Sequence, residues 1–176
     1  MSKEFSYPQF ENGVKVISRA GDAVNDMMMN ITAYRMEAGQ SLTFCHAAEE
    51  TAVLLILGEV TFQWNDRRET GQRNSFIEEG PHCLHVCRNV AVTVTAHTGS
   101  EVLVQSTEND REFAPVFYRP EDCRDDIFGL DVFDNKMKRT VRTVFDYRNA
   151  PYSNMVNGEV INHQGGWSSY TPHHHP

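Results

Sequence analysis

The stretch Thr51-Ala-Val-Leu-Leu-Ile-Leu57 is the densest apolar run of the chain, and the alternating stretch Val60-Thr-Phe-Gln-Trp64 follows it almost directly. A short apolar run is typical of a strand buried on both faces, whereas strict alternation is typical of a strand with one buried face. Gly58 lies between the two, and glycine adopts backbone angles that other residues resist. We therefore expect two β segments joined by a tight corner at Gly58.

Similar patterns recur on both sides of this stretch. Turn signals such as Gly21-Asp22 and Thr98-Gly99-Ser100 separate the apolar segments, whereas Asn65–Asn74 is polar and turn-rich. About eight short strands are predicted in residues 13–106, and no amphipathic helix. This favours an all-β fold, either a closed barrel or a jelly roll. The predicted strands include residues 14–16, 31–36, 42–44, 76–77, 82–87, 90–96 and 102–104.

Beyond this unit the chain changes character. Residues 111–136 are rich in proline, glycine and acidic side chains, which predicts a linker with a short helix or a crossing strand. Arg139–Phe145 and Val156–Ile161 again have the pattern of strands. We therefore predict a first barrel in residues 1–110 and the opening strands of a second in residues 137–176.

Charge and composition narrow the class of partner. The 176 residues carry a formal net charge of −8 and no basic cluster, which argues against nucleic acid and anionic membranes. No apolar run approaches the ~20 residues of a membrane span, and the first residues are too polar for a signal peptide. We expect a cytoplasmic protein with a small-molecule partner, whose cysteines Cys45, Cys83, Cys87 and Cys123 are free thiols.

The end of the chain carries a candidate metal clip. His173 and His175 stand two residues apart after the Gly165-Gly166 turn, and Pro172 and Pro176 flank them. Alternate side chains of a strand share one face, so both imidazoles can lean toward a single ion. We therefore predict that both histidines are metal ligands.

The first unit has the spacing of a metal-binding motif without its ligands. Laid on a pattern of Gly, His-x-His, Glu and Gly, the segment from Gly39 to Gly58 keeps both glycines, but its ligand positions fall on Cys45, Ala47 and Thr51. In this spacing it resembles the cupins, whose barrels hold metal on adjacent strands. We expect the frame of a cupin barrel without its metal. The neighbouring His46 and Glu50 are an alternative, but a one-residue slip would turn them to the opposite face of a strand.

A second cluster contains His82, Cys83, His85 and Cys87. Thiolate and imidazole ligands suit zinc or iron, but a structural zinc site needs a second pair of ligands, which the sequence does not supply. We expect buried thiols with a histidine at the rim.

The strings Asn157-Gly-Glu-Val-Ile-Asn162 and Gly165-Gly-Trp-Ser-Ser-Tyr-Thr-Pro-His-His-His-Pro176 resemble the 5-deoxy-glucuronate isomerases, two-cupin enzymes of myo-inositol catabolism. The resemblance implies isomerisation of 5-deoxy-D-glucuronate to 5-dehydro-2-deoxy-D-gluconate, an aldose-to-ketose change assisted by a divalent metal (zinc, manganese or iron). It implies His173 and His175 as metal ligands, with a further glutamate and histidine beyond Pro176. The chain is thus expected to be C-terminally truncated and not to hold the metal tightly alone.

The remaining site residues are less defined. The substrate carboxylate needs a cationic or hydroxyl partner, for which we consider Arg142 and Tyr170, and the general base is not identified. Alternatives are a non-catalytic sugar-acid-binding cupin, a related uronate ketol isomerase, and a cupin dioxygenase. A barrel that is begun but not closed leaves strand edges unpaired, so we expect residues 137–176 to pack on the first barrel or on another subunit of a homo-oligomer.

Overall fold

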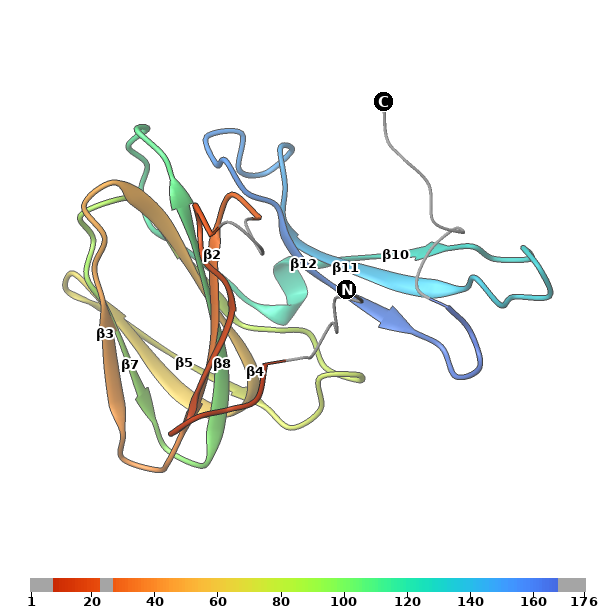
Figure 1. Ribbon diagram of the computed structural model, residues 1–176, viewed down its shortest axis with the longest axis horizontal. Coiled ribbons are helices and arrows are strands. Elements are labelled where there is room, and N and C mark those ends of the chain that lie inside the picture. The colour runs from red at the N-terminus through yellow and green to blue at the C-terminus, as the bar shows by residue number, and fades with distance from the viewer. Residues whose placement is uncertain (1–7, 23–26, 168–176) are drawn as a thin grey trace, which may run out of the picture.

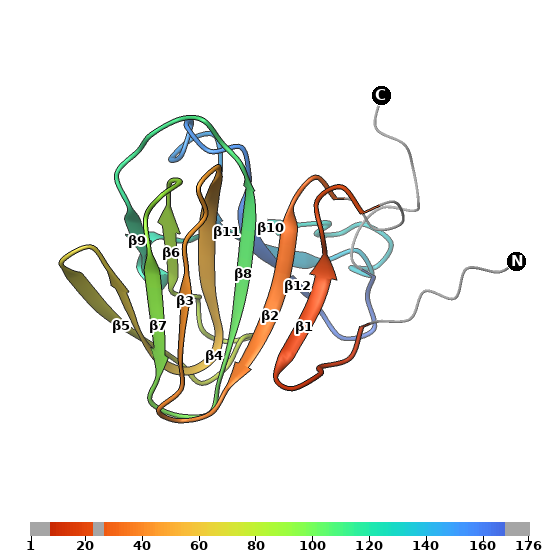
Figure 2. The ribbon, with the colours of Figure 1, turned by 60° about the vertical axis from the view of Figure 1, so that its left-hand side comes forward.

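The computed structural model describes residues 8–22 and 27–167, which form strands and one short 3-10 helix (Figures 1 and 2). None of the helices in these residues is long and apolar enough to cross a membrane. The elements are β1 (Val14–Ser18), β2 (Asn30–Met36), β3 (Ser41–Phe44), β4 (Glu49–Trp64), β5 (Arg67–Arg73), β6 (Cys83–Val86), β7 (Val92–Ala96), β8 (Ser100–Glu108), β9 (Val116–Tyr118), η1 (Pro120–Asp122), β10 (Arg124–Phe128), β11 (Arg139–Phe145) and β12 (Asn157–Asn162).

The first nine strands form an antiparallel jelly roll, which confirms the predicted fold class. One sheet has the strand order β1-β2-β8-β4-β6-β9, and β3, β7, β5 and the second half of β4 form the other. Residues 49–57 of β4 pair with β8 in the first sheet, whereas residues 58–64 pair with β5 and β7 in the second. The hydrogen-bonded path does not close into a ring within the described residues.

Gly58 is the corner at which β4 passes from one sheet to the other. Its φ is +99°, and a Cβ placed there would lie 2.7 Å from the carbonyl oxygen of Gly99 and closer still to Ser100 Oγ. The predicted corner is therefore present, but β4 bends through it as one continuous strand, with a register shift between Leu55 and Leu57. Only glycine fits both the angle and the space.

The core lies between the two sheets. On strand β4, Val53 and Leu55 face it from the first sheet, and Val60, Phe62 and Trp64 face it from the second. Each of these side chains is at most 3% exposed. The alternation seen in the sequence after Gly58 is thus the alternation of a strand with one buried face.

The outer face of the first sheet is also buried around β4 and β6. Ala52 and Leu54 of β4 join Cys83 in a second apolar cluster, together with Phe145 and Met155 from the C-terminal segment. Residues on both faces of this half of β4 are therefore buried, which explains why the stretch from Thr51 is apolar without alternation. The expectation that residues 137–176 pack on the first barrel is confirmed for the part from Arg142 to Glu159, which contacts the barrel through its apolar side chains and through bonds to Glu79 and Arg73.

The C-terminal segment forms a separate three-stranded sheet in the order β10-β11-β12, which extends to one side of the barrel (Figure 1). The bounds of β11 are those predicted from the sequence, and β12 begins one residue later than predicted. Residues 111–136, expected to be a linker, also contribute β9, η1 and β10, and β9 pairs with β6 of the barrel.

Two sequence predictions were wrong. Asn65–Asn74, described as turn-rich, contains β5, which follows β4 after the two-residue turn Asn65-Asp66. Polar side chains are tolerated there because β5 pairs only with β4 and lies at a sheet edge. Phe76-Ile77, predicted as a strand, lies in a turn, with the two side chains 55% and 57% exposed.

A buried carboxylate and imidazole connect the barrel to the C-terminal segment. Glu50 on β4 and His85 on β6 are both 0% exposed, and Glu50 Oε2 lies 2.8 Å from His85 Nε2. Glu50 also accepts hydrogen bonds from the Ser153 hydroxyl at 3.0 Å and the Asn154 backbone N–H at 2.6 Å. The His85 ring stacks on Phe145, with centroids 4.2 Å apart. This cluster holds the loop before β12 against the barrel.

We predict that Gly58→Ala lowers the free energy of unfolding by more than about 3 kcal/mol, because the new Cβ combines an unfavourable φ with overlap against Gly99 and Ser100. Gly39→Ala is the matched control. Gly39 also has a positive φ, +86°, but no atom lies within 4 Å of its added Cβ. It should cost only about 1 to 2 kcal/mol. Equal urea midpoints for the two variants would contradict the steric role of Gly58.

We also predict that Glu50→Gln lowers the free energy of unfolding and makes this free energy depend less on pH in the acid range. Burial raises the pKa of Glu50, but hydrogen bonds from His85 and Asn154 outweigh it and hold this pKa below its ordinary value. The stabilisation is therefore present above the unfolded-state pKa, near 4.5, and is lost as the pH falls through the lower folded-state pKa. At pH 7 the free energy of unfolding of the variant should be about 3 kcal/mol lower than that of the wild type.

Urea unfolding of both proteins at pH 7 and at pH 3 measures this effect. The wild type should lose more stability on acidification than Glu50→Gln, while Glu112→Gln, which changes a side chain that is 78% exposed, should behave as wild type. If the stability of the wild type and of Glu50→Gln changed equally between pH 7 and pH 3, Glu50 would not contribute to the pH dependence of stability.

Candidate functional site

The predicted metal clip lies outside the described residues, as does Tyr170. The chain leading to it is positioned by the small sheet: Gly166 N–H donates to the His163 carbonyl at 3.0 Å, and Trp167 N–H donates to the Lys136 carbonyl at 2.9 Å. Residues up to 167 therefore run from β12 back beside the segment that precedes β11. Of His173 and His175 themselves the structure says nothing.

Arg142, the candidate for the substrate carboxylate, lies on β11 and is only 7% exposed. Its Nε and Nη2 donate to the Asp125 carboxylate at 3.0 and 3.1 Å, and Nη1 donates to the Glu79 carbonyl at 2.7 Å. The neighbouring Glu159 lies 3.7 Å from Nη1 and forms two 2.7 Å bonds with the fully buried Arg73. The guanidinium of Arg142 thus has partners inside the protein. Arg142 is therefore not a solvated surface arginine, which would be the simplest alternative to a role in substrate binding.

The mouth of the first barrel is a polar cavity above an apolar floor. Inward-facing residues of β4 change from Leu55 and Val53 to Thr51 and Glu49 toward this end, and those of β8 change from Val102 and Val104 to Ser106. The cavity has a volume of about 200 Å³. Its lining is Ser18, Arg19, Asn30, Thr32, Tyr34, Phe44, His46, Glu49, Val104 and Ser106.

Glu49 is the centre of the polar groups in this mouth. Asn30 Nδ2 donates to both of its oxygens, at 3.2 and 3.3 Å, and the Ser106 hydroxyl donates to Oε2. His46 Nδ1 lies 3.6 Å from Glu49 Oε2 and 3.0 Å from the Thr51 hydroxyl. A carboxylate, an imidazole, an amide and hydroxyls therefore converge on one small cavity.

The positions that would hold metal in a cupin are distributed differently here. Cys45 and Ala47 are exposed, and only Thr51 is buried. The expectation that His46 would turn away from the barrel interior was wrong, because His46 continues the inward alternation of Leu42 and Phe44 past the end of β3. Glu50 does face outward, as expected. Within residues 8–22 and 27–167 no group of three or more His, Cys, Asp or Glu side chains could hold a metal ion.

The cluster on β6 has a structural arrangement. Cys83 and Cys87 are buried, as predicted, but His85 is fully buried against Glu50 and does not lie at a rim. Burial raises the pKa of the Cys83 thiol far above its usual range, and it raises the pKa of Cys123 to about 11. Both thiols are therefore protonated and poorly nucleophilic at neutral pH.

Sequence analysis missed the Glu50–His85 pair. The two residues lie 35 positions apart, and each faces the outer side of the first sheet, where a barrel considered alone would meet water. The alternation along β4 could have indicated it. Glu50 lies on the same face of the strand as the apolar residues Ala52 and Leu54, which predicts that this face is buried.

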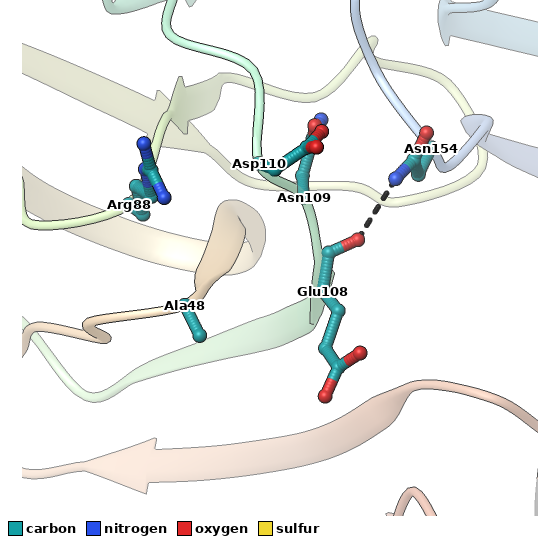
Figure 3. A pocket seen from close by; sticks show the side chains of 6 residues that line it. All are labelled: Ala48, Arg88, Glu108, Asn109, Asp110 and Asn154. Carbon is teal, nitrogen blue, oxygen red and sulfur yellow. Dashed lines mark hydrogen bonds between the residues drawn. The ribbon is translucent and has the colours of Figure 1, made fainter.

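A cleft of about 470 Å³ lies where the barrel meets the C-terminal segment (Figure 3). Figure 3 shows Asn154 donating its side-chain N–H to the Glu108 carbonyl, at 2.8 Å, while the Glu108 carboxylate points away from Asn154. Arg88 on the far side of the cleft pairs with the exposed Glu112 at 3.3 Å. The cleft is thus spanned by a contact between β8 and the loop before β12.

Comparison with known proteins agrees with the fold and with the resemblance seen in the sequence. The chain is 24% identical over 173 residues to the 5-deoxy-glucuronate isomerase of Bacillus subtilis (strain 168), covering 95% of this chain and 62% of that protein. The enzyme of the same name from Bacillus licheniformis is 23% identical with the same coverage. The chain thus spans 62% of the length of these curated relatives.

Among solved structures, the crystal structure of an IolB-like protein from Salmonella typhimurium LT2 superposes with a TM-score of 0.72. It is 20% identical, and the match covers 82% of this chain and 54% of that one. At this identity the similarity establishes the fold alone. The sequence model of the KduI/IolB family matches residues 5–176, and the chain therefore belongs to the KduI/IolB family.

Proposed function

We propose that this protein isomerises a deoxy sugar acid, converting the aldose 5-deoxy-D-glucuronate to the ketose 5-dehydro-2-deoxy-D-gluconate in inositol catabolism. The observation that carries the proposal is membership of the KduI/IolB family across residues 5–176, a span that includes the histidines near the end of the chain. The relatives named 5-deoxy-glucuronate isomerase support the same reaction. Its proposed setting is the cytoplasm, as a homo-oligomer acting on a small sugar acid.

We assign His173 and His175 as ligands of a divalent metal, because two imidazoles spaced two residues apart suit one ion and the resemblance implies these residues. Such an ion, when bound, polarises a carbonyl and the adjacent hydroxyl. The donor set, two neutral imidazoles, suits zinc, manganese or iron, and further ligands complete the coordination.

Binding of the substrate carboxylate is assigned to Arg142 and Tyr170. Arg142 is held between Asp125 and the Glu79 carbonyl, so its guanidinium is fixed in position. It can bind a substrate carboxylate only by exchanging one of these contacts. The Asp125 side chain is 45% exposed, and displacing it costs less than displacing a buried partner would. Tyr170 would donate its hydroxyl.

Interconversion of 5-deoxy-D-glucuronate by the full chain tests the reaction directly. With Zn²⁺, Mn²⁺ or Fe²⁺ added, NMR should show loss of the aldehyde signal and growth of a ketone product under anaerobic conditions. Consumption of oxygen together with substrate would point instead to a dioxygenase. Binding of the sugar acid without any conversion would favour a non-catalytic binding protein.

The metal clip has a test of its own. His173→Ala and His175→Ala should each weaken binding of Zn²⁺ by at least about tenfold, because each removes one of few ligands. His174→Ala is the matched control, since His174 is not one of the two histidines assigned to the metal and carries the same side chain. Calorimetric titration measures the three affinities. Equal losses in all three variants would show a non-specific histidine cluster.

A further inference from the structure

We propose that the mouth of the first barrel is a second ligand site, separate from His173 and His175, which binds a monosaccharide-sized molecule with neighbouring hydroxyl groups. The site is the cavity lined by Asn30, Thr32, Tyr34, His46, Glu49 and Ser106. It follows from the geometry of this barrel and holds whether or not the protein is an isomerase.

The size of the cavity limits the ligand. Its volume of about 200 Å³ lies below the ~300–1,000 Å³ of pockets for drug-sized molecules, so it suits a single sugar ring or an open sugar chain. The floor is closed by the apolar barrel core, including Val104 at 6% exposure. A ligand can therefore enter only from the open end, with its polar groups facing the walls.

The walls present both hydrogen-bond acceptors and donors. The Glu49 carboxylate has four lone-pair positions; Asn30 and Ser106 occupy part of this capacity, and 26% of the side chain is exposed. Hydroxyls of Thr32 and Tyr34 and the imidazole of His46 line the same space. Adjacent hydroxyl groups of a sugar each donate and accept, so they match such a mixed lining better than a purely anionic or apolar ligand would.

One wall of the cavity is aromatic. Tyr34 and Phe44 lie with ring centroids 5.4 Å apart and an interplanar angle of 56°. Aromatic side chains offer apolar surface for the C–H groups of a sugar, beside the polar groups that bind its hydroxyls. The combination is that of small-molecule sites, in which a few convergent polar groups are set among apolar ones.

Stability alone does not require this arrangement. Ser18 and Ser106 are each 2% exposed and face the interior at positions where the same barrel, deeper in, uses valine or methionine. An apolar mouth would bury more hydrocarbon and would need no carboxylate. Arg19 lies at the rim and is exposed, which places a cation where the carboxylate of a sugar acid would emerge.

NMR titration of the full chain with D-glucose and with D-glucuronate tests the site. Both share the row of hydroxyls, and tighter binding of D-glucuronate would assign a carboxylate contact to Arg19. We expect shifts confined to residues of the mouth, including Asn30, His46 and Ser106. Glu49→Gln should weaken binding about fivefold, the value of one hydrogen bond of about 1 kcal/mol.

Two further variants and a control make the result decisive. Thr32→Val keeps the shape of the cavity and removes one hydroxyl, so it should weaken binding even if Glu49→Gln folds poorly. Glu101→Gln, which changes a surface carboxylate paired with Arg35, should bind as wild type. Absence of shifts at the mouth, or shifts that neither mouth variant reduces, would overturn the proposal.

The double variant His173→Ala/His175→Ala separates this site from the proposed catalytic one. It should lose metal binding and isomerisation but keep the shifts at the barrel mouth. If the double variant abolishes sugar binding altogether, the ligand sits at the C-terminal histidines and the second site does not exist. If isomerisation is never observed while the mouth still binds sugar, only the proposed function fails.

Discussion

Around β4 and β6 the first sheet is buried on both faces, and this constraint joins the parts of the chain. Its inner face packs against the second sheet, while Ala52, Leu54 and Cys83 on the outer face are at most 2% exposed beneath Phe145 and its neighbours. Removing the C-terminal cover would expose this apolar surface to water at about 25 cal/mol for each Å². The barrel and the small sheet therefore share a core, although their strands belong to separate sheets.

Polar groups give this apolar interface a defined geometry. Glu50, which pairs with His85 inside the barrel, accepts hydrogen bonds from Ser153 and Asn154 of the C-terminal segment. Arg73 of the barrel pairs with Glu159 of that segment, and the side chains of Glu50, His85 and Arg73 have no exposed surface. Buried ion pairs add little net stability, because desolvation offsets most of the attraction. A shifted docking of the small sheet, however, would remove the bonds of Ser153 and Asn154 to Glu50 and the carboxylate partner of Arg73, so that both buried groups would keep only their contacts within the barrel. The pairs thus favour one register of docking over its alternatives.

The sequence allowed prediction of those features that depend on local pattern. The run from Thr51, the corner at Gly58 and the strand Arg139–Phe145 each have a periodicity or a residue type that suffices. Features that depend on partners far along the chain were missed. Nothing near β5 shows that its polar residues pair with β4, and nothing near His85 shows that a loop more than 60 residues later covers it.

In the candidate site, too, local pattern could be predicted from the sequence, whereas contacts between distant parts of the chain could not. Motif spacing laid the ligand positions of a cupin on Cys45, Ala47 and Thr51, of which Cys45 and Ala47 are exposed. The motif spacing placed His46 on the outer face, although the inward alternation of Leu42 and Phe44 continues to His46. It could not place Glu49 beside Asn30 and Ser106, which come from three different strands. Arg142 was chosen for its position on a strand, but its contacts with Asp125 and Glu79 depend on tertiary packing.

The polar groups of the barrel mouth form hydrogen bonds with one another, whereas the ligands of a metal site depend on the bound ion. A cluster of imidazoles and carboxylates arranged for a cation carries repulsion and desolvation cost until the ion binds. Here the Glu49 carboxylate receives its hydrogen bonds from Asn30 and Ser106, and His46 has Thr51 as a partner. The first barrel can therefore fold without metal and still present hydrogen-bonding groups to a small ligand. The barrel mouth is thus a preorganised polar cavity, which suits a small ligand rich in hydroxyl groups.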